Sequence, residues 1–170
     1  MDAKTKYLPR IIDKELATRL ASTGAVVIEG PKACGKTETA RQIAASEVLL
    51  DIDENARQAV AIDPKLVLDG EVPRLIDEWQ LEPSIWNHIR RIVDDRGLPG
   101  QFILTGSQNF LLLQKVSQSL AGRCAVLHLL PFSLSELKER KPLAVDSIGR
   151  KLPAKNRTLD DRLPPVLYKG

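Results

Sequence analysis

The chain has 170 residues, of which 43% are hydrophobic and 28% charged, and its formal net charge is +3 at pH 7. Length and composition predict one globular domain with room for a sizeable core. The sequence has no apolar run of about 18 residues and no signal-peptide pattern at its N-terminus, so we expect a soluble, cytoplasmic protein without a membrane span. The two cysteines lack metal-ligand spacing and are predicted to be free thiols.

The predicted elements alternate between helix and strand along the chain. Residues 13–22 predict a short amphipathic helix, with Leu16 and Leu20 on one face. Residues 55–68 begin as an Ala-rich helical stretch that Pro64 interrupts. The alternation predicts a three-layer α/β fold with a parallel sheet. Strands are predicted at about 25–29, 48–51, 74–77, 102–106 and 125–130, and further helices at about 36–46, 84–95, 110–119 and 133–140.

The most specific motif follows the first predicted strand, where Gly30 to Thr37 match the phosphate-binding loop pattern G-x-x-x-x-G-K-S/T. Gly30 and Gly35 permit the backbone to wrap around a phosphate with its N–H groups pointing inward. Lys36 supplies positive charge for the β- and γ-phosphates, and the Thr37 hydroxyl is placed to ligate Mg²⁺. The motif therefore predicts a bound nucleoside triphosphate. The predicted nucleotide-binding residues are Gly30, Pro31, Lys32, Ala33, Cys34, Gly35, Lys36, Thr37 and Glu38.

Paired acids end the third predicted strand, where Asp77 and Glu78 follow two apolar residues. Ligands of parallel α/β sheets gather at the carboxyl ends of the strands, so these acids are expected near the phosphate-binding loop. Asp77 is predicted to hold Mg²⁺ through a water, because that ion prefers oxygen ligands and keeps much of its hydration shell. Glu78 is predicted to be the general base that orients and polarises the attacking water.

Two further features complete the predicted site. Thr105 and Ser107 lie at the end of the fourth predicted strand, and one of these hydroxyls is expected to contact the γ-phosphate or the attacking water, with Ser107 the first choice. Arg123 follows Gly122 directly before the last predicted strand. Its guanidinium is a candidate arginine finger, which acts either in its own active site or in that of a neighbouring subunit.

The basic residues are concentrated at the end of the chain. Residues 138–170 contain nine Lys or Arg and four Asp or Glu, which leaves the first 137 residues with a net charge of −2. Four of the eleven prolines also lie there, without apolar periodicity, so we expect a loosely docked or poorly ordered tail. The tail is predicted to be either a solvated linker or a contact with nucleic acid or anionic surfaces. The predicted division is a core at residues 1–137 and a tail at 138–170.

In combination, these motifs resemble a prokaryotic AAA-type ATPase family whose members join an N-terminal ATPase domain to a C-terminal domain of unknown function. The resemblance covers about residues 7–137. It implies a P-loop fold of the AAA type with the sheet order 5-1-4-3-2, and ATP and Mg²⁺ as ligands. It also implies metal and base roles for Asp77 and Glu78, an arginine finger at Arg123, and a position near the nucleotide for Arg10. The matching segments are 7–10, 30–37, 75–80, 103–107, 120–123 and 130–136.

The sequence departs from this family at two places. Lys32 stands where family members usually carry Arg, which keeps the charge but loses a planar, bidentate donor. Only 34 residues follow Glu136, too few for the usual second domain, so we expect the tail to be the truncated start of a missing C-terminal region.

Three functional hypotheses follow from these patterns. The first is Mg²⁺-dependent ATP hydrolysis coupled to an unknown partner or remodelling step, in a homo-oligomer in which Arg123 acts between subunits. The second is a nucleotide-gated binding module with little turnover, whose partner contacts the basic tail or residues 111–116. The third is a small-molecule P-loop kinase, which the adjacent acids Asp77 and Glu78 disfavour because they suit the activation of water.

Overall fold

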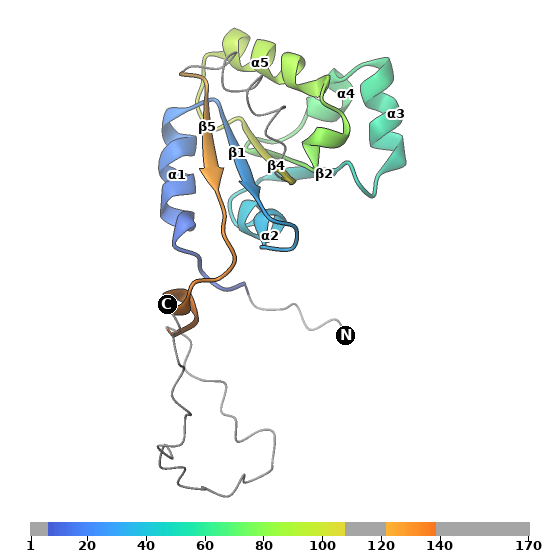
Figure 1. Cartoon of the computed structure of the whole chain (residues 1–170). Helices are drawn as coiled ribbons and strands as arrows, with labels where there is room; N and C mark the ends of the chain where they lie inside the picture. The colour runs from blue at the N-terminus through green and yellow to red at the C-terminus, as the bar shows by residue number, and fades with distance from the viewer. Residues whose placement is uncertain (1–6, 108–121, 139–170) are drawn as a thin grey trace, which may run out of the picture. The chain divides into compact units, whose positions relative to one another are not determined.

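The computed structural model describes residues 7–107 and 122–138 (Figure 1). The chain divides into the units Met1–Leu137 and Lys138–Gly170, and the fold described here is that of the first unit. Its centre is a five-stranded sheet in which every pair is parallel, in the order β2-β3-β4-β1-β5. The predicted three-layer fold and strand order are confirmed. The strands are β1 (Ala25–Gly30), β2 (Ser46–Leu49), β3 (Arg74–Asp77), β4 (Phe102–Ser107) and β5 (Cys124–His128).

Helices cover both faces of the sheet (Figure 1). All six residues of β1 are buried, as expected for a central strand with a continuous apolar run. Val27 packs on one face in a cluster with α3, α4 and α5, whereas Ile28 packs on the other face with α1 and α2. The helices are α1 (Ile12–Ser22), α2 (Lys36–Arg41), α3 (Glu54–Ile62), α4 (Lys65–Leu68), α5 (Ile85–Arg96) and α7 (Leu134–Lys138), and a 3₁₀ turn, η1, spans Trp79–Leu81.

The predicted boundaries on either side of the loop between α2 and β2 differ from the structure, whereas the predicted interruption at Pro64 agrees with it. The helix predicted to reach residue 46 ends at Arg41, and β2 begins at Ser46 instead of residue 48. The chain joins the sheet early because the N–H of Ala45 donates to the Pro73 carbonyl at 2.8 Å. The Ala-rich stretch divides into α3 and α4 at Pro64, which has no N–H to continue a helix. The helix predicted at 110–119 and the partner-binding segment 111–116 lie outside the described residues.

The strand register brings the predicted motifs to one edge of the sheet. Gly30 at the end of β1 pairs with Ser107 at the end of β4, and Asp77 at the end of β3 pairs with Thr105. Parallel strands make this meeting automatic once the order is set, because every carboxyl end faces the same edge. Within the described ranges, no helix is both long and apolar enough to cross a membrane.

Candidate functional site

The phosphate-binding loop, residues 30–37, connects the end of β1 to the start of α2. Its backbone turns through two left-handed residues, Ala33 with φ of 61° and Gly35 with φ of 98°. Gly30 is required at the start of the loop because a Cβ there would lie 2.1 Å from the carbonyl oxygen of Leu129. The loop therefore has the tight backbone curvature that a phosphate cradle needs.

Lys36 is folded back over the loop that precedes it. Its side chain is buried, and its Nζ donates to the carbonyl oxygens of Gly30 at 3.1 Å and Pro31 at 2.8 Å. A positive charge is thereby fixed at the mouth of the loop. The predicted residues Pro31, Lys32 and Ala33 are exposed in the loop, whereas the carboxylate of Glu38 lies on the surface of α2 in an ion pair with Arg41 at 2.6 Å.

The carboxylate of Asp77 joins two of the predicted motifs. Its Oδ1 accepts hydrogen bonds from the Thr37 hydroxyl, at 2.8 Å, and from the Thr105 hydroxyl, although Asp77 itself is buried. These hard oxygen atoms suit Mg²⁺. No group of three or more His, Cys, Asp or Glu side chains in the described ranges could hold a metal. A bound Mg²⁺ would accordingly depend on phosphate oxygens and water for its remaining ligands.

Glu78 adopts an uncommon backbone conformation directly after β3. Its φ is 53°, and Ala33 and Glu78 are the two residues other than glycine with positive φ in the described part of the chain. Such strain costs on the order of 1–3 kcal/mol and tends to occur at functional sites. Both strained residues belong to the predicted site, one in the phosphate-binding loop and one at the predicted base.

Gln80 is a site residue that the sequence did not indicate. Its Nε2 donates to Oε2 of Glu78, so the predicted base is held by an amide from η1. Gly106 makes room for this side chain, because a Cβ there would lie 2.3 Å from Oε1 of Gln80. An amide two residues after an acid pair is the signal in the sequence, but the contact with Gly106 becomes visible only in the fold.

Arg123 lies at the opposite edge of the sheet from the phosphate-binding loop. Its carbonyl accepts from the N–H of Ala25, the first residue of β1, whereas the loop follows the last residue of that strand. Its guanidinium forms an ion pair with Asp94 of α5, and both side chains are partly exposed. This position favours action between chains over action within one chain, and the arginine-finger role stays a prediction.

Glu29 places a buried carboxyl directly before the phosphate-binding loop. Its side chain is 4% exposed, and its Oε2 accepts no hydrogen bond in the described part of the chain. Nδ1 of His128 on the neighbouring strand lies 3.7 Å from that oxygen. Burial raises the pKa of Glu29 to about 7, because the ionised form loses its hydration. Ordinary sequence patterns do not reveal this residue, since it occupies a position inside an apolar strand.

Stability should depend on pH through Glu29. Because its pKa is about 7 in the folded chain and 4.5 is its ordinary value, ionisation opposes folding progressively as pH rises from about 4.5 to 7. We expect the free energy of unfolding of Glu29→Gln, measured by denaturant titration, to exceed that of the wild type by on the order of 2 kcal/mol at pH 8. At pH 4.5 the two free energies of unfolding should be nearly equal. Equal stability of both proteins at pH 8 would contradict this assignment.

Comparison with known proteins identifies similar chains. A family model described as "AAA domain" matches residues 22–138. Two curated relatives, uncharacterized protein Mb2031c of Mycobacterium bovis and uncharacterized protein Rv2008c of Mycobacterium tuberculosis, are each 33% identical over 107 residues. The matched part is 61% of this chain and 24% of each relative. The chain thus spans about a quarter of the length of the curated relatives it matches.

Among solved structures, the chain is similar to that of Saccharomyces cerevisiae RIF2, at 14% sequence identity and a TM-score of 0.38. That similarity covers 80% of this chain and 60% of the yeast chain, and at this score it supports no functional conclusion.

Proposed function

Because this chain belongs to the AAA domain family, a family of ATP-binding proteins, we propose that it binds ATP with Mg²⁺ at residues 30–37 and hydrolyses it. The observation that carries the proposal is the hydrogen bond between Thr37 and Asp77, which joins the phosphate-binding loop to the acid pair across 40 residues of sequence. The strained backbone at Glu78 and the buried ammonium of Lys36 support it.

Binding would use the loop backbone and two side chains. The phosphates would be bound by the backbone N–H groups around Gly35 and by the Lys36 ammonium. Both are suited to anions, because the loop leads into the N-terminus of α2. Thr37 and Asp77 would hold Mg²⁺, which when bound neutralises charge on the phosphate oxygens. The loop residues from Pro31 to Cys34 would line the triphosphate site, and Glu38 on α2 is the last residue of the proposed set.

Hydrolysis would proceed by attack of water on the γ-phosphorus. The Glu78 carboxylate accepts the proton of that water as the new P–O bond forms and the bridging P–O bond to ADP breaks. Ser107, opposite Gly30 in the register, is the proposed sensor of the γ-phosphate. Thr105 is fully buried, and its hydroxyl donates to the carboxylate of Asp77, so its proposed role is to orient that carboxylate. The acid pair favours water over a bound acceptor, so a kinase reaction is not proposed.

Steady-state phosphate release tests this function. The purified wild-type chain, given ATP and Mg²⁺, is expected to release inorganic phosphate at a rate that saturates with ATP and stops when EDTA is added. No release above the buffer control, from a folded protein that binds ATP, would exclude hydrolysis.

The bond between Gln80 and Glu78 favours a second candidate, a nucleotide-gated binding module with slow turnover. While the amide occupies Oε2 of Glu78, that oxygen is not free to accept a proton from water. We expect Gln80→Leu to accelerate phosphate release if this bond limits turnover. If phosphate release by Gln80→Leu is as slow as by the wild type, the bond does not limit turnover, and this support for the binding module is lost.

Action of Arg123 between subunits predicts complementation. Arg123→Ala is expected to lower phosphate release by about 10³-fold, the lower end of the range for arginine fingers. A Lys36→Ala variant retains Arg123 but has a defective loop, so mixing the two variants should recover activity if they assemble together. Mixtures that show only the sum of the separate activities would contradict a role between subunits. Arg57→Ala, in an exposed pair with Glu54, is the control.

A further inference from the structure

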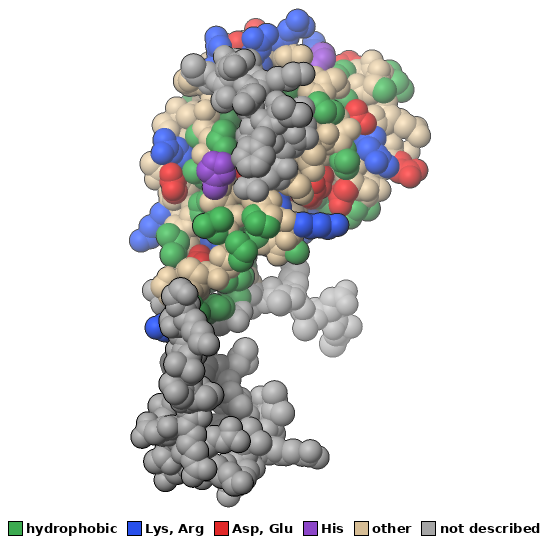
Figure 2. All heavy atoms as spheres, in the orientation of Figure 1, with side chains coloured by type: hydrophobic (Ala, Val, Ile, Leu, Met, Phe, Trp, Pro, Cys, Tyr) green, Lys and Arg blue, Asp and Glu red, His purple; other side chains and the backbone are tan. Residues whose placement is uncertain are grey.

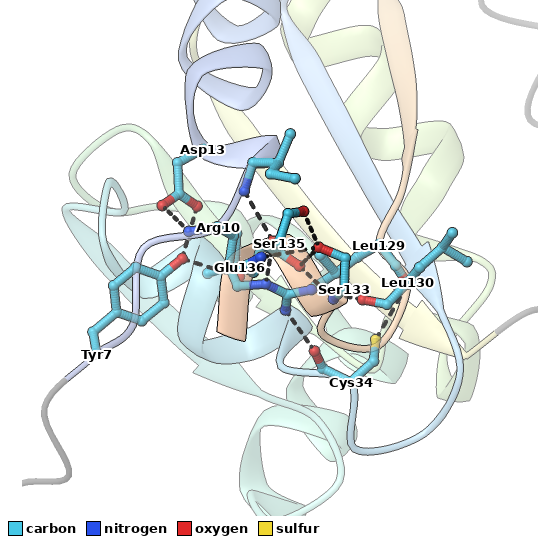
Figure 3. A network of polar contacts seen from close by, with 11 residues as sticks. Tyr7, Arg10, Asp13, Cys34, Leu129, Leu130, Ser133, Ser135 and Glu136 are labelled. Carbon is cyan, nitrogen blue, oxygen red and sulfur yellow. Dashed lines mark hydrogen bonds and ion pairs between the residues drawn. The ribbon is translucent and has the colours of Figure 1, made fainter. Parts of the chain in front are cut away.

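Arg10 joins three segments that are far apart in the sequence (Figure 3). Its Nη1 donates to the carbonyl oxygen of Cys34 in the phosphate-binding loop at 2.9 Å. Its Nη2 donates to the carbonyl oxygen of Leu130, after β5, at 2.7 Å, and its Nε donates to Oε1 of Glu136 at 3.0 Å. The residue is 7% exposed, so this charge is held inside the protein by specific partners.

Glu136 is fixed independently of Arg10. The backbone N–H groups of Ser133 and Ile11 donate to its two carboxylate oxygens at 2.7 and 3.0 Å. The N–H of Glu136 in turn donates to the Ser133 hydroxyl, which completes a capping box at the start of α7. Hydrogen bonds from the backbone of Ser133 and Ile11 lower the pKa of Glu136 to about 2, so the carboxylate facing Arg10 is charged at neutral pH.

The segment that follows β5, residues 129–133, also contacts the phosphate-binding loop directly, in contacts that do not involve Arg10. The thiol of Cys34 donates to the carbonyl oxygen of Leu129 at 3.4 Å, and Gly30 approaches that same oxygen closely. The ring of Phe132 lies against Arg10, with the guanidinium carbon 4.0 Å from the ring centroid. Figure 2 shows hydrophobic side chains exposed over this segment, where Leu130, Phe132 and Leu134 are among the exposed residues.

The chain before α1 is tied to α2 as well. The Tyr7 hydroxyl donates to Asp13 at 2.7 Å and contacts the hydroxyl of Thr39, a buried residue of α2, at 3.3 Å. Asp13 also accepts from the N–H of Arg10 at 2.8 Å, which fixes the backbone of the arginine (Figure 3). Arg10 is therefore oriented at both its backbone and its side chain.

We propose that Arg10 is a positioning residue of the nucleotide site: held by Glu136, it fixes the Cys34–Gly35 peptide in the orientation in which the loop binds phosphate. This role rests on the proposed binding of ATP at the loop. In a planar trans peptide the N–H points opposite to the C=O. Because Arg10 holds the Cys34 carbonyl, the Gly35 N–H points away from Arg10, and the left-handed φ of Gly35 continues the turn into α2.

The contacts assign Arg10 to the loop and not to the nucleotide. All three guanidinium nitrogens already donate to protein acceptors, and one face of the group lies on Phe132. Only the planar fork of arginine reaches acceptors in three directions, whereas a lysine ammonium is a single point on a flexible chain. Arg10→Lys should therefore keep the charge and lose the positioning.

Equilibrium binding of ATP with Mg²⁺ tests this role in the full chain. We expect affinity to fall by about 10- to 100-fold in Arg10→Lys, because a charged hydrogen bond that orders the loop is lost. Glu136→Gln keeps the shape of its side chain but not its charge, and should lose about two- to fivefold. Arg19→Ala, which removes an exposed pair with Glu15, should bind as the wild type does.

A rescue experiment separates positioning from a merely structural role. In Arg10→Ala, millimolar guanidinium ion should restore part of the ATP affinity, whereas methylammonium at the same concentration should not. Thermal unfolding of each variant shows whether the chain is folded at the assay temperature. Folded Arg10→Lys with wild-type affinity would overturn the role of Arg10 alone. Failure of the folded wild type to bind ATP would overturn the proposed function, and this role with it.

Discussion

Replacement of Glu78 by Gln is expected to lower phosphate release by about 10²- to 10⁴-fold while ATP still binds. The amide cannot accept a proton from the attacking water, although its size and its position after β3 are unchanged. Binding should survive because, in the proposed site, the phosphate contacts would come from the loop and from Lys36. Steady-state phosphate release and equilibrium ATP binding, measured on the same preparation, give both quantities.

Glu71→Gln is the matched control for this substitution, since it makes the same chemical change at an exposed residue before β3. It should release phosphate at the wild-type rate. If Glu78→Gln also retains the wild-type rate, Glu78 is not the base, and the strained backbone at that residue needs another explanation.

Replacement of Lys36 by Ala is expected to weaken ATP binding by about 100-fold or more. The ammonium is folded over the loop, 3.1 and 2.8 Å from the carbonyl oxygens of Gly30 and Pro31. Its loss removes a charge that the phosphates would otherwise approach closely. Titration with a fluorescent ATP analogue, or calorimetry, measures the change.

Two controls accompany the Lys36 variant. Lys14→Ala removes an exposed lysine of α1 and should leave ATP affinity unchanged. Thermal unfolding without nucleotide should show that Lys36→Ala remains folded, because the Lys36 side chain belongs to neither of the two hydrophobic clusters. Equal ATP affinity in Lys36→Ala and wild type would place the nucleotide elsewhere.

Local patterns predicted the sheet well because its central strands are apolar runs that are followed by polar residues. Val27 and Leu104 lie in such runs and are fully buried. Edge positions were less accurate, since β2 is partly exposed and its start depends on pairing with β3, a contact distant in sequence. The end of α2 depends on the same pairing, so its predicted length was too great.

The site residues that belong to sequence motifs could be predicted, whereas the contacts between segments far apart in the sequence could not. Lys36 and Asp77 stand in recognisable patterns, and their placement at one edge follows from parallel strands. The partners of Arg10 are 24, 120 and 126 residues away, and two of them are backbone carbonyls, which have no signature in a sequence. The position of Arg123, by contrast, follows from the sequence. A residue directly before β5 lies at the edge of a parallel sheet opposite the loop, which follows β1.

Calorimetric titration of the folded wild-type chain with ATP, with and without Mg²⁺, tests the central claim most directly. The account predicts saturable binding at one site per chain with a Kd below about 1 mM, strengthened by Mg²⁺ and weakened by EDTA. It also predicts loss of that binding in Lys36→Ala. Absence of heat and of thermal stabilisation at millimolar ATP with Mg²⁺, from a protein shown to be folded, would contradict it.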